Sequence, residues 1–494
     1  MIARRNVLQL AGVGAVTALA SNAGTASAAG RATSSGHDHD MPTTRPADAG
    51  VHPAVTKFSL ALPLLPTARP ALRTSQGDVY YSDVRALSSE IYPGLLTPTY
   101  GYFGQWVPPV IRARKGRPTV VVHRNRTSMP ISVHLHGGVT RAPFDGQMRL
   151  PIAPGGALPY VYDNDQDAAT LWMHDHTHMM DAQHVYAGMA SPYLIGSDEE
   201  DALGLPSGAY DIPLMLRDGD FGSKAQLIYT MDDTASRTTI MVNGRPWPYL
   251  KVQGRRYRFR VINASNMRFF VLGLSDGANL TQVGGDLGLL PAPVEAPVVV
   301  LSPGERAELV IDFAAYAPGS TVDLVNYIGP GDMTDVGQVM RFVVGDRVED
   351  TSQVPDVLMP LAAPKAATVQ RRFVLRSSEP GEMPMTGSIN GKTFDMDRVD
   401  TTIAWGTTEE WEIVNENPTI PHNFHTHLAH FTVVGRSDGP VSPAESGIKD
   451  TVPIFPGQSV RLRLTFDKHR GVYPYHCHML DHGAMGMMAQ MQIV

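Results

Sequence analysis

Residues 254–263 read GRRYRFRVIN and alternate apolar with charged side chains between a glycine and an asparagine. Tyr257, Phe259 and Val261 fall on one face of an extended chain, and the arginines between them fall on the other. This period of two is typical of a strand with one buried face, and the bounding Gly and Asn are turn residues. The stretch therefore predicts one strand of an antiparallel β-structure whose inner face packs on a core.

The same pattern occurs twice more, once from Lys115 to Asn125 and once from Gly406 to Asn415. Each copy is followed by a Pro-Gly turn and a second alternating strand that ends in Asp; these segments are 154–163, 303–312 and 456–467. A repeat of about 150 residues is too long for a solenoid and indicates tandem domains. Because sandwiches bury such strands economically, we expect an all-β chain of three tandem β-sandwich domains.

Two stretches between the repeats predict the domain boundaries. Residues 198–201, Asp-Glu-Glu-Asp, predict a charged turn, and residues 354–367 are rich in Pro and Ala. We therefore expect a first domain over residues 55–203, a second over 204–353 and a third over 354–494.

The composition excludes several classes of protein. Of 494 residues, 43% are hydrophobic, which is enough for several cores. The formal charge is −7 and the basic residues are scattered, so we expect no nucleic-acid partner. No apolar run reaches the ~18–20 residues of a membrane span, so we expect none in the mature protein. The single cysteine, Cys477, excludes an intramolecular disulfide.

The N-terminus has the features of an export signal. Two arginines at positions 4 and 5 precede an apolar stretch, which ends in small residues at Ala26-Ser27-Ala28. This order is typical of a secretory signal peptide, and the paired arginines indicate the twin-arginine route. We expect residues 1–28 to be this signal and residues 29–54 to be a disordered leader. The mature protein is then extracellular or in the cell envelope.

Ten of the 18 histidines lie in four short clusters, two near each end of the mature chain and none in the middle repeat. The clusters are His134-Leu-His136-Gly, Trp172-Met-His174-Asp-His176, His422-Asn-Phe-His425-Thr-His427 and His476-Cys477-His478 with His482 and Met487 following. Residues two apart in a strand face the same side, so each His-x-His pair points two imidazoles together. A single pair is compatible with a solvated strand face. Burying four pairs without a metal would leave many polar atoms unpaired, so the set predicts metal binding.

Cys477 indicates which metal. If His476 and His478 point to one side of a strand, Cys477 points to the other. A thiolate with two imidazoles, from His422 and His482, and a weak Met487 thioether is the ligand set of a blue copper site. The other eight imidazoles would form a multi-metal site on the order of 10 Å away, by strand and side-chain dimensions. One-electron intake joined to such a site suits the four-electron reduction of O2.

The motifs H-x-H-G, W-x-H-x-H, H-x-x-H-x-H and H-C-H-x3-H-x4-M resemble those of the multicopper oxidases, from about residue 55 to the end of the chain. Four further stretches favour the three-domain branch that contains spore-coat laccase, bilirubin oxidase and the periplasmic cuprous oxidase. These stretches are Val185-Tyr-Ala-Gly188, Asn390-Gly-Lys-Thr-Phe-Asp395, Lys449-Asp-Thr-Val452 and Gly486-Met-Met488. The resemblance implies three cupredoxin-like Greek-key domains, with no copper ligand in the second.

The resemblance also implies four copper ions and their ligands. The type 1 ion would be held by His422, Cys477, His482 and Met487. The type 2 ion would be held by His134 and His425. The type 3 pair would be held by His136, His174, His176, His427, His476 and His478. Asp145 lies nine residues after His136, where related oxidases carry an acid that assists proton delivery to oxygen; an exposed loop carboxylate is the alternative.

The chain departs from the family pattern at two positions. Gly483 follows the second type 1 histidine, where this branch commonly has a Glu credited with proton supply. That role would shift to Asp145 or Asp481, or turnover would be slower. Asn423 stands where Pro is usual, which removes a rigid turn but no ligand. The axial Met487 predicts a lower type 1 potential than an apolar residue would give, which favours electron-rich donors.

These features support an exported laccase-type enzyme, which we expect to be a monomer. It would take single electrons from phenols, aminophenols or aromatic amines near His482, pass them through Cys477 and reduce O2 to water. One alternative is a cuprous or manganese ion oxidase; the 23 methionines are spread along the chain, however, and we expect them mainly to fill cores. A second alternative is a copper-free structural relative, although such relatives have lost ligands. A copper nitrite reductase is weaker, because its two-domain design lacks the H-C-H link.

Overall fold

The computed structural model describes residues 50–379 and 382–494, and strands predominate in both ranges. The predicted signal, residues 1–28, and nearly all of the predicted leader lie outside the described residues. In the described part of the chain, no helix has both the length and the apolar character needed to cross a membrane.

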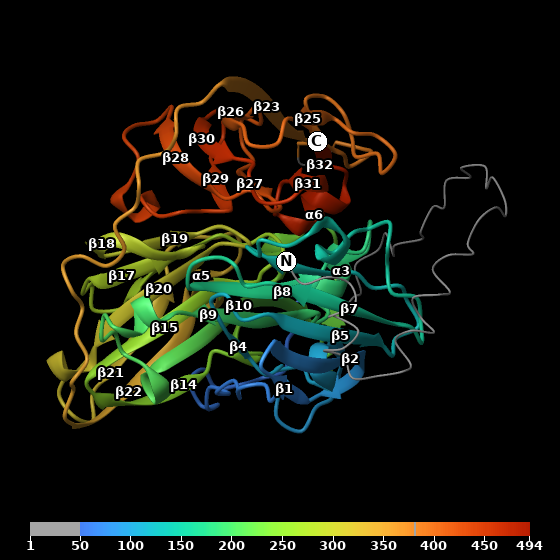
Figure 1. The fold of residues 1–494 in the computed structure, drawn as a ribbon. Coiled ribbons are helices and arrows are strands. Elements are labelled where there is room, and N and C mark those ends of the chain that lie inside the picture. The colour runs from blue at the N-terminus through green and yellow to red at the C-terminus, as the bar shows by residue number, and fades with distance from the viewer. Residues whose placement is uncertain (1–49, 380–381) are drawn as a thin grey trace.

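The strands form six sheets, two in each of three successive ranges, 72–196, 211–347 and 369–493, which we call the first, second and third sandwich. This arrangement confirms the predicted all-β chain of tandem sandwiches. Figure 1 shows the first sandwich in blue to teal, the second in green to yellow, and the third, in orange to red, resting on both.

The first sandwich contains nine strands in two sheets. One sheet has the order β1 (Leu72–Thr74), β2 (Gly77–Ser89), β5 (Thr119–Asn125), β7 (Ala157–Tyr162), with β3 (Thr97–Gly101) also paired to β2. The other has the order β4 (Ile111–Arg114), β9 (Ala190–Gly196), β8 (Ala169–Asp175), β6 (Val133–His136).

The second sandwich is the largest. One sheet has the order β13 (Arg245–Pro246), β12 (Thr239–Val242), β10 (Asp211–Phe221), β15 (Arg256–Asn263), β20 (Arg306–Asp312), β17 (Leu280–Gly285), β18 (Gly288–Ala296), with β11 (Leu227–Ile228) beside β10. The other has the order β14 (Tyr249–Gly254), β22 (Gln338–Arg347), β21 (Thr321–Asn326), β16 (Phe270–Leu274), β19 (Val299–Leu301).

The third sandwich has two five-stranded sheets. One has the order β24 (Gly387–Ile389), β23 (Val369–Ser377), β26 (Thr408–Asn415), β30 (Ser459–Thr465), β28 (Phe431–Arg436). The other has the order β25 (Thr401–Ile403), β32 (Met488–Ile493), β31 (Gly471–His476), β27 (His422–Thr426), β29 (Thr451–Ile454).

Helices are short and lie in the connections. The described α-helices are α3 (Asp181–Tyr186), α4 (Asp198–Asp201), α5 (Met333–Val336) and α6 (Leu480–Ala484). The described 3-10 helices are η1 (Tyr102–Gly104), η2 (Ala142–Phe144), η3 (Gly208–Tyr210), η4 (Thr234–Ser236), η5 (Phe313–Ala315) and η6 (Pro443–Glu445). Helices α3 and α6 pack together, which joins the first sandwich to the third.

The repeat found in the sequence is one antiparallel strand pair in each sandwich. These pairs are β5 with β7, β15 with β20, and β26 with β30. Most strand pairs are antiparallel, as predicted, but β2 and β5, β10 and β15, and β23 and β26 pair in parallel. In each case the chain visits the opposite sheet between the two strands, so it returns in the same direction, as Greek-key connections allow.

The asparagine that ends each repeat has the same structural role three times. Each side-chain amide donates to two backbone carbonyls across the turn, and each amide oxygen accepts a backbone N–H two residues on. Asn263, for example, donates to the Arg268 oxygen at 2.8 Å and the Leu301 oxygen at 3.0 Å. All three side chains are fully buried. The turn residue seen in the sequence therefore satisfies backbone groups that would otherwise be unpaired in the core.

The two predicted boundary stretches lie between sandwiches. Residues 198–201 form helix α4 rather than the predicted turn, because the Ser197 hydroxyl caps it by accepting from the Glu200 N–H and its acids lie in the first turn. Residues 354–367 contain neither helix nor strand and run along the side of the molecule to the third sandwich (Figure 1).

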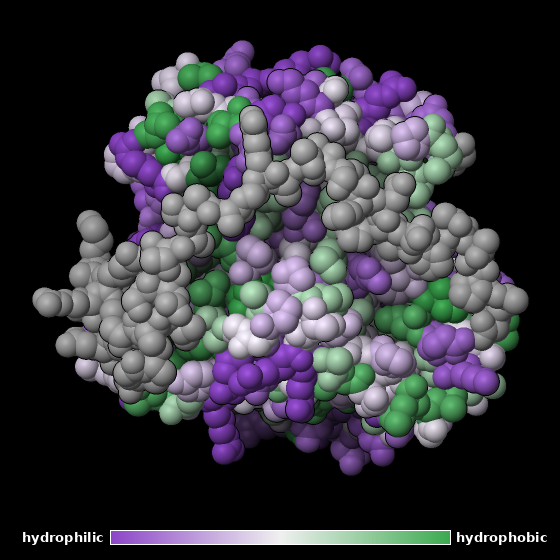
Figure 2. Space-filling model, turned by 90° about the vertical axis from the view of Figure 1, so that its right-hand side faces the viewer, coloured by the Kyte–Doolittle hydropathy of each residue, from purple (hydrophilic) through white to green (hydrophobic). Residues whose placement is uncertain are grey.

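Each sandwich has its own apolar core, centred on Val121, Phe259 and Trp411 respectively. On the face seen in Figure 2, hydrophobic residues form small groups separated by hydrophilic ones. The large apolar side chains are therefore concentrated inside the three sandwiches, which makes each of them a rigid support for the loops between its strands.

We predict that Asn263→Ala destabilises the second sandwich by at least about 3 kcal/mol, because it leaves two buried carbonyls and one N–H unpaired at roughly 1–3 kcal/mol each. Asn279→Ala is the matched control; Asn279 is exposed, and its loss should cost less than about 0.5 kcal/mol. Denaturant unfolding measures both. Equal effects of the two substitutions would contradict the role given to the buried asparagine.

Candidate metal centre

Four strands from the first and third sandwiches carry the predicted histidines to one place. In the first sandwich, β6 pairs antiparallel with β8 so that His134 faces His174 across the ladder. In the third, β27 pairs with β31 so that His425 faces His476. Because alternate residues share a face, His136, His176, His427 and His478 extend the same two surfaces.

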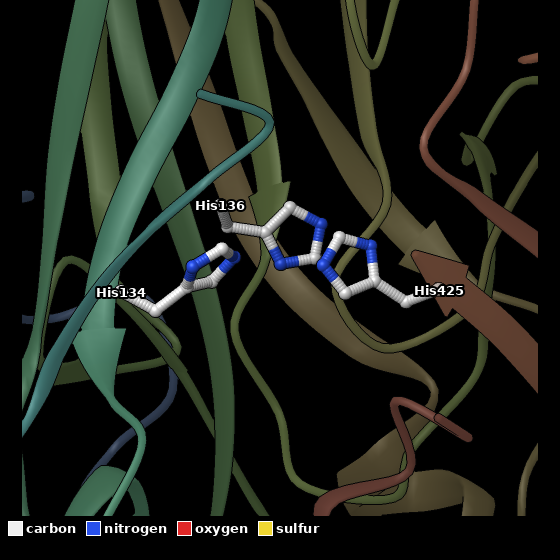
Figure 3. Close-up of side chains that lie close together, drawn as sticks. All are labelled: His134, His136 and His425. Carbon is white, nitrogen blue, oxygen red and sulfur yellow. The ribbon is translucent and has the colours of Figure 1, made fainter. Parts of the chain in front are cut away.

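The two histidine-bearing surfaces face each other, and imidazoles from both enter a shared cluster. His136 Nδ1 lies 3.1 Å from His478 Nε2, and His176 Nε2 lies 3.4 Å from His476 Nε2. Figure 3 shows His134 and His136 extending from β6 toward His425 of β27, with the three rings close together. The ring stack of His136 on His425 has centroids 3.9 Å apart. The structure therefore brings together all eight imidazoles that the sequence assigns to a multi-metal site.

These eight imidazoles divide into sets whose nitrogens are close enough to share an ion. His136, His174 and His478 form one set, and His176, His427 and His476 form another. His134 and His425 stand between them and join a set with His136. Every member is buried.

A separate set lies on the other face of β31. Cys477 follows this strand, and its Sγ lies 3.8 Å from Nδ1 of both His422 and His482. The two Nδ1 atoms are 3.1 Å apart. Met487 is fully buried, and its backbone oxygen accepts a hydrogen bond from the Cys477 N–H. Cys477 and its two flanking histidines therefore serve different sets.

The outer nitrogen of most rings is held by a hydrogen bond, which fixes the inner nitrogen as an acceptor. His174 Nδ1 donates to the Asp175 oxygen, His425 Nδ1 to the Asp450 oxygen and His476 Nδ1 to the Cys477 oxygen. In the separate set, His422 Nε2 donates to Asn417 Oδ1 at 2.8 Å. Each of these rings therefore presents a lone pair inward.

Inward lone pairs at these distances fit a metal cation. Nε2 of His134 and Nε2 of His425 are buried and have no hydrogen-bond partner among the described residues. Opposed acceptor atoms in a dry cluster are unfavourable unless a cation lies between them. Imidazole suits copper, zinc or iron, and the thiolate and thioether of the separate set favour copper. The residues present therefore fit the copper ions that the sequence implies.

Burial sets the charge of the rings. Burial lowers the pKa of His476 to about 4. It lowers the pKa of six other cluster histidines well below the ordinary value; these are His136, His174, His176, His425, His427 and His478. These seven rings are therefore neutral at neutral pH, which is the state that ligates metal.

Asp145 is buried beside the cluster, which excludes the exposed loop position considered from the sequence. Its Oδ2 accepts from His427 Nδ1 at 2.8 Å, and its Oδ1 lies 3.2 Å from His134 Nδ1. Burial raises the pKa of Asp145 to about 6. The carboxyl group therefore contacts two of the predicted ligands.

Asp481, the other acid considered for proton supply, faces away from the cluster. Its carboxylate accepts from Arg237 Nη2 at 2.6 Å, Asn266 Nδ2 at 3.0 Å and the Tyr229 hydroxyl at 3.1 Å. Although burial opposes ionisation, Arg237 and these donors lower the pKa of Asp481. A carboxylate held ionised by so many donors is poorly suited to release protons.

Two further histidines lie near the cluster. His184 is buried and its Nδ1 contacts Asp175 Oδ2 at 2.9 Å, while His178 packs beside Phe394. The methionines are divided: many are in cores, but Met179 and Met383 are 60% and 79% exposed. Met179 and Met383, which lie in surface loops, are therefore exceptions to the expectation that methionines mainly fill cores.

Several residues around the sets were not singled out from the sequence. Asp450 Oδ1 accepts from His136 Nε2 at 2.9 Å, and Arg306 of the second sandwich pairs with the same carboxylate. Asn417, which orients His422, also closes the third repeat turn. Asp450 lies in a stretch noted only for its resemblance. No local pattern marks Arg306, because Asp450, the partner that links it to the cluster, lies 144 residues away.

One glycine is required by the cluster. Gly304 belongs to the Pro-Gly turn of the second sandwich and has φ of +88°. A Cβ built there would lie 2.8 Å from His478 Nδ1 and 3.0 Å from His136 Cε1. The turn therefore packs directly against the imidazoles of the other two sandwiches.

Comparison with known proteins gives consistent matches. Multicopper oxidase family profiles match residues 87–200 and 360–494, the ranges that contain every clustered histidine. A bilirubin oxidase from Albifimbria verrucaria is 34% identical over 91% of this chain and 84% of its own length. A laccase from Bacillus subtilis is 32% identical over 88% of this chain and 98% of its own. A laccase structure from Pediococcus acidilactici has a TM-score of 0.82, with 30% identity over 90% of this chain and 95% of its own.

We predict that metal-free protein, prepared by chelation, is stabilised against heat by copper ions and not by Mg²⁺. A ligand at a hundredfold excess over its Kd stabilises by about 2.7 kcal/mol per site, and Mg²⁺ prefers oxygen ligands that the sets lack. Calorimetric scans with each ion measure the effect. Equal stabilisation by both ions, or none by copper, would contradict the fit of the donor sets to a soft metal.

Proposed function

Because the chain belongs to the multicopper oxidase family, we propose that it is an exported, laccase-type oxidase. It takes single electrons from phenols, aminophenols or aromatic amines and reduces O2 to water. The observation that carries this proposal is the position of Cys477, which contacts one donor set while its neighbours His476 and His478 contact the other. Two adjacent peptide units thus join a single-ion site to a multi-ion site.

The single-ion site would hold type 1 copper. Its ligands are His422, Cys477, His482 and Met487. Support comes from the 3.8 Å distances of Sγ to both Nδ1 atoms and from the complete burial of all four residues. Gly387 also supports it, because a Cβ there would lie 2.8 Å from Met487 Cβ, so only a glycine leaves space for the thioether side chain.

The multi-ion site would hold three copper ions, making four in the protein. We assign the type 2 ion to His134 and His425, whose unpaired Nε2 atoms support that role. We assign the type 3 pair to the two three-histidine sets, which are His136, His174 and His478, and His176, His427 and His476. Bound copper supplies the one-electron redox chemistry that these side chains lack.

His482, although buried, lies beside a partly exposed side chain at the single-ion site. Its Nε2 lies 3.6 Å from Asp232 Oδ1, and the Asp232 side chain is 32% exposed. A small reductant at this surface can therefore approach the ring that we propose as the point of electron intake. The buried Cys477 then provides the covalent path from this ring toward the cluster.

Asp145 is the residue that we propose to assist proton delivery. It is buried against His134 and His427, so it is within reach of the space between the two surfaces. Gly483 leaves no acid in the position where this branch usually has one. The Asp481 carboxylate accepts a hydrogen bond from Arg237. Asp145 is therefore the better candidate for proton delivery.

We retain the predicted organisation as part of the proposal. Residues 1–28 are a twin-arginine signal and 29–54 a leader, and the domains span 55–203, 204–353 and 354–494. The protein acts as a monomer outside the cytoplasm or in the envelope.

A second candidate function is oxidation of cuprous or manganese ions with the same donor sets. The exposed thioethers of Met179, Met383 and Met385 favour it, because soft sulfur at the surface binds Cu(I). Steady-state rates of copper-loaded protein on cuprous ion and on a dimethoxyphenol separate the two functions. The laccase-type proposal fails if the phenol is not oxidised at a rate that depends on O2.

We predict that Cys477→Ser abolishes both the blue thiolate-to-copper colour and oxidation of the phenol, because no other thiol exists in the chain. Met487→Leu is the matched control; it removes only a weak axial ligand and should keep the colour while raising the potential of the site. Absorption spectra and redox titration measure these outcomes. A blue, active Cys477→Ser variant would refute the assignment.

We predict that Asp145→Asn lowers turnover at saturating reductant by roughly 10²-fold while leaving the blue colour intact, because an amide keeps the shape but cannot transfer the proton. Asp481→Asn serves as the comparison; because Asp481 precedes His482, its effect should fall on the single-ion site, and reoxidation by O2 should change far less. Stopped-flow reoxidation of the reduced protein by O2 measures the step directly. Unchanged reoxidation in the Asp145 variant would exclude this residue.

A further inference from the structure

The second sandwich provides none of the predicted metal ligands, yet it buries one arginine against each of the two donor sets. The two arginines are Arg306, at the start of β20, and Arg237, which follows η4. Both side chains are almost completely buried. Each pairs with an aspartate of the third sandwich that lies next to, or hydrogen-bonds with, a predicted ligand.

Arg306 lies beside the multi-ion site and contacts all three sandwiches. Its Nη1 and Nη2 donate to the two oxygens of Asp450 at 2.7 and 2.5 Å. Its Nε donates to the backbone oxygen of Thr170 in β8 at 2.9 Å, and Nη2 also donates to the Asp286 oxygen at 2.8 Å. Such a two-pronged pair fixes the plane of the carboxylate.

That carboxylate orients the imidazoles. Asp450 Oδ1 accepts from His136 Nε2 at 2.9 Å, and the backbone oxygen of Asp450 accepts from His425 Nδ1 at 2.9 Å. The bond to Nε2 leaves His136 Nδ1 as the inward acceptor. Arg306 is therefore one contact away from a ligand of the type 3 pair and one of the type 2 ion.

Arg237 has the equivalent position at the single-ion site. Its Nη2 donates to Asp481 Oδ2 at 2.6 Å and to the Thr230 oxygen at 2.8 Å, and its guanidinium lies over the rings of Tyr186 and Tyr229. Asp481 immediately precedes His482 in helix α6. The pair therefore holds the short helix that carries a type 1 ligand.

Each arginine is linked to only one of the two donor sets. Arg306 reaches His136 and His425 through Asp450, whereas Arg237 reaches His482 through Asp481. General attachment between domains is provided elsewhere, for example by Arg258, which is buried between Glu200 of helix α4, in the connection from the first sandwich, and Glu308 of the second sandwich. A role limited to holding domains together would not require separate arginines at the two sites.

We propose that Arg306 and Arg237 are positioning residues, each specific for one metal site. Arg306 fixes the geometry of the multi-ion site through Asp450, and Arg237 fixes that of the single-ion site through Asp481. The second sandwich thus determines the shape of both sites without providing a ligand. This inference rests on the proposed function, because it assumes that both donor sets bind copper.

The test uses Arg306→Met and Arg237→Met in the full-length protein, with Arg258→Met as the matched control for a buried interdomain arginine. Copper per chain, the blue absorption band and the type 2 electron paramagnetic resonance signal are measured together with the thermal midpoint. We expect Arg306→Met to keep the blue band but to fall from about four copper ions per chain toward one. We expect Arg237→Met to lose or shift the blue band and to keep the type 2 signal.

The control and the conservative variants separate positioning from general stability. Arg258→Met should lower the thermal midpoint without changing either signal. Arg306→Lys and Arg237→Lys keep the charge. The first loses the two-pronged pair with Asp450, and the second loses the flat guanidinium that lies over Tyr186 and Tyr229, so each should bind copper with altered spectra at the corresponding site only. If a Met variant does not fold, the Lys variant at the same position tests the same metal site, by its blue band or its type 2 signal.

Two results distinguish failure of this inference from failure of the proposed function. If the unmodified protein shows neither copper signal, the proposed function is wrong. If it shows both signals, and the Arg306 and Arg237 variants change both in parallel or change neither, the positioning roles are wrong while the oxidase proposal stands.

Discussion

The two-residue period of a β-strand is the constraint on which the metal centre depends. Side chains at successive positions of an extended chain point in opposite directions, so His476 and His478 face one way and Cys477 the other. Strand β31, which ends at His476 and leads directly into Cys477 and His478, is the central strand of its sheet, where its neighbours fix its twist and register. A shift of one residue would exchange the thiol with the imidazoles and destroy both donor sets at once. The core packing of a whole domain therefore determines which atoms face which metal.

Much of this arrangement could be predicted from the sequence because it depends on local periodicity. The three copies of the strand-turn-strand repeat predicted the three sandwiches, and the His-x-His spacing predicted the paired imidazoles. What could not be predicted depends on contacts between distant segments. The parallel pairing of β2 with β5 follows from the path of the chain between sheets, and the role of Arg306 follows from Asp450, which lies 144 residues further along the chain.

Single positions show the same limit at a smaller scale. Asp145 and Asp481 look alike as acids near histidines, but one is buried against two imidazoles and the other is surrounded by donors from a different sandwich. Residues 198–201 read as a charged turn, and only the preceding serine reveals a helix. In each case the sequence identified the residue types. Their burial and their hydrogen-bond partners are set only when distant segments come together in the fold.

The crowded turn at Gly304 has a consequence for how the three repeats can vary. Gly155 and Gly457 occupy the corresponding turns of the outer sandwiches, with φ of +77° and +70°, and no atom lies within 4 Å of a Cβ built at either position. Asparagine or aspartate, which tolerate this backbone region, could replace glycine at these two sites. At Gly304 the same replacement would displace imidazole rings. The three turns have similar backbones but tolerate different substitutions. A randomised library built on this scaffold should vary the turns at Gly155 and Gly457 and keep the turn at Gly304 unchanged.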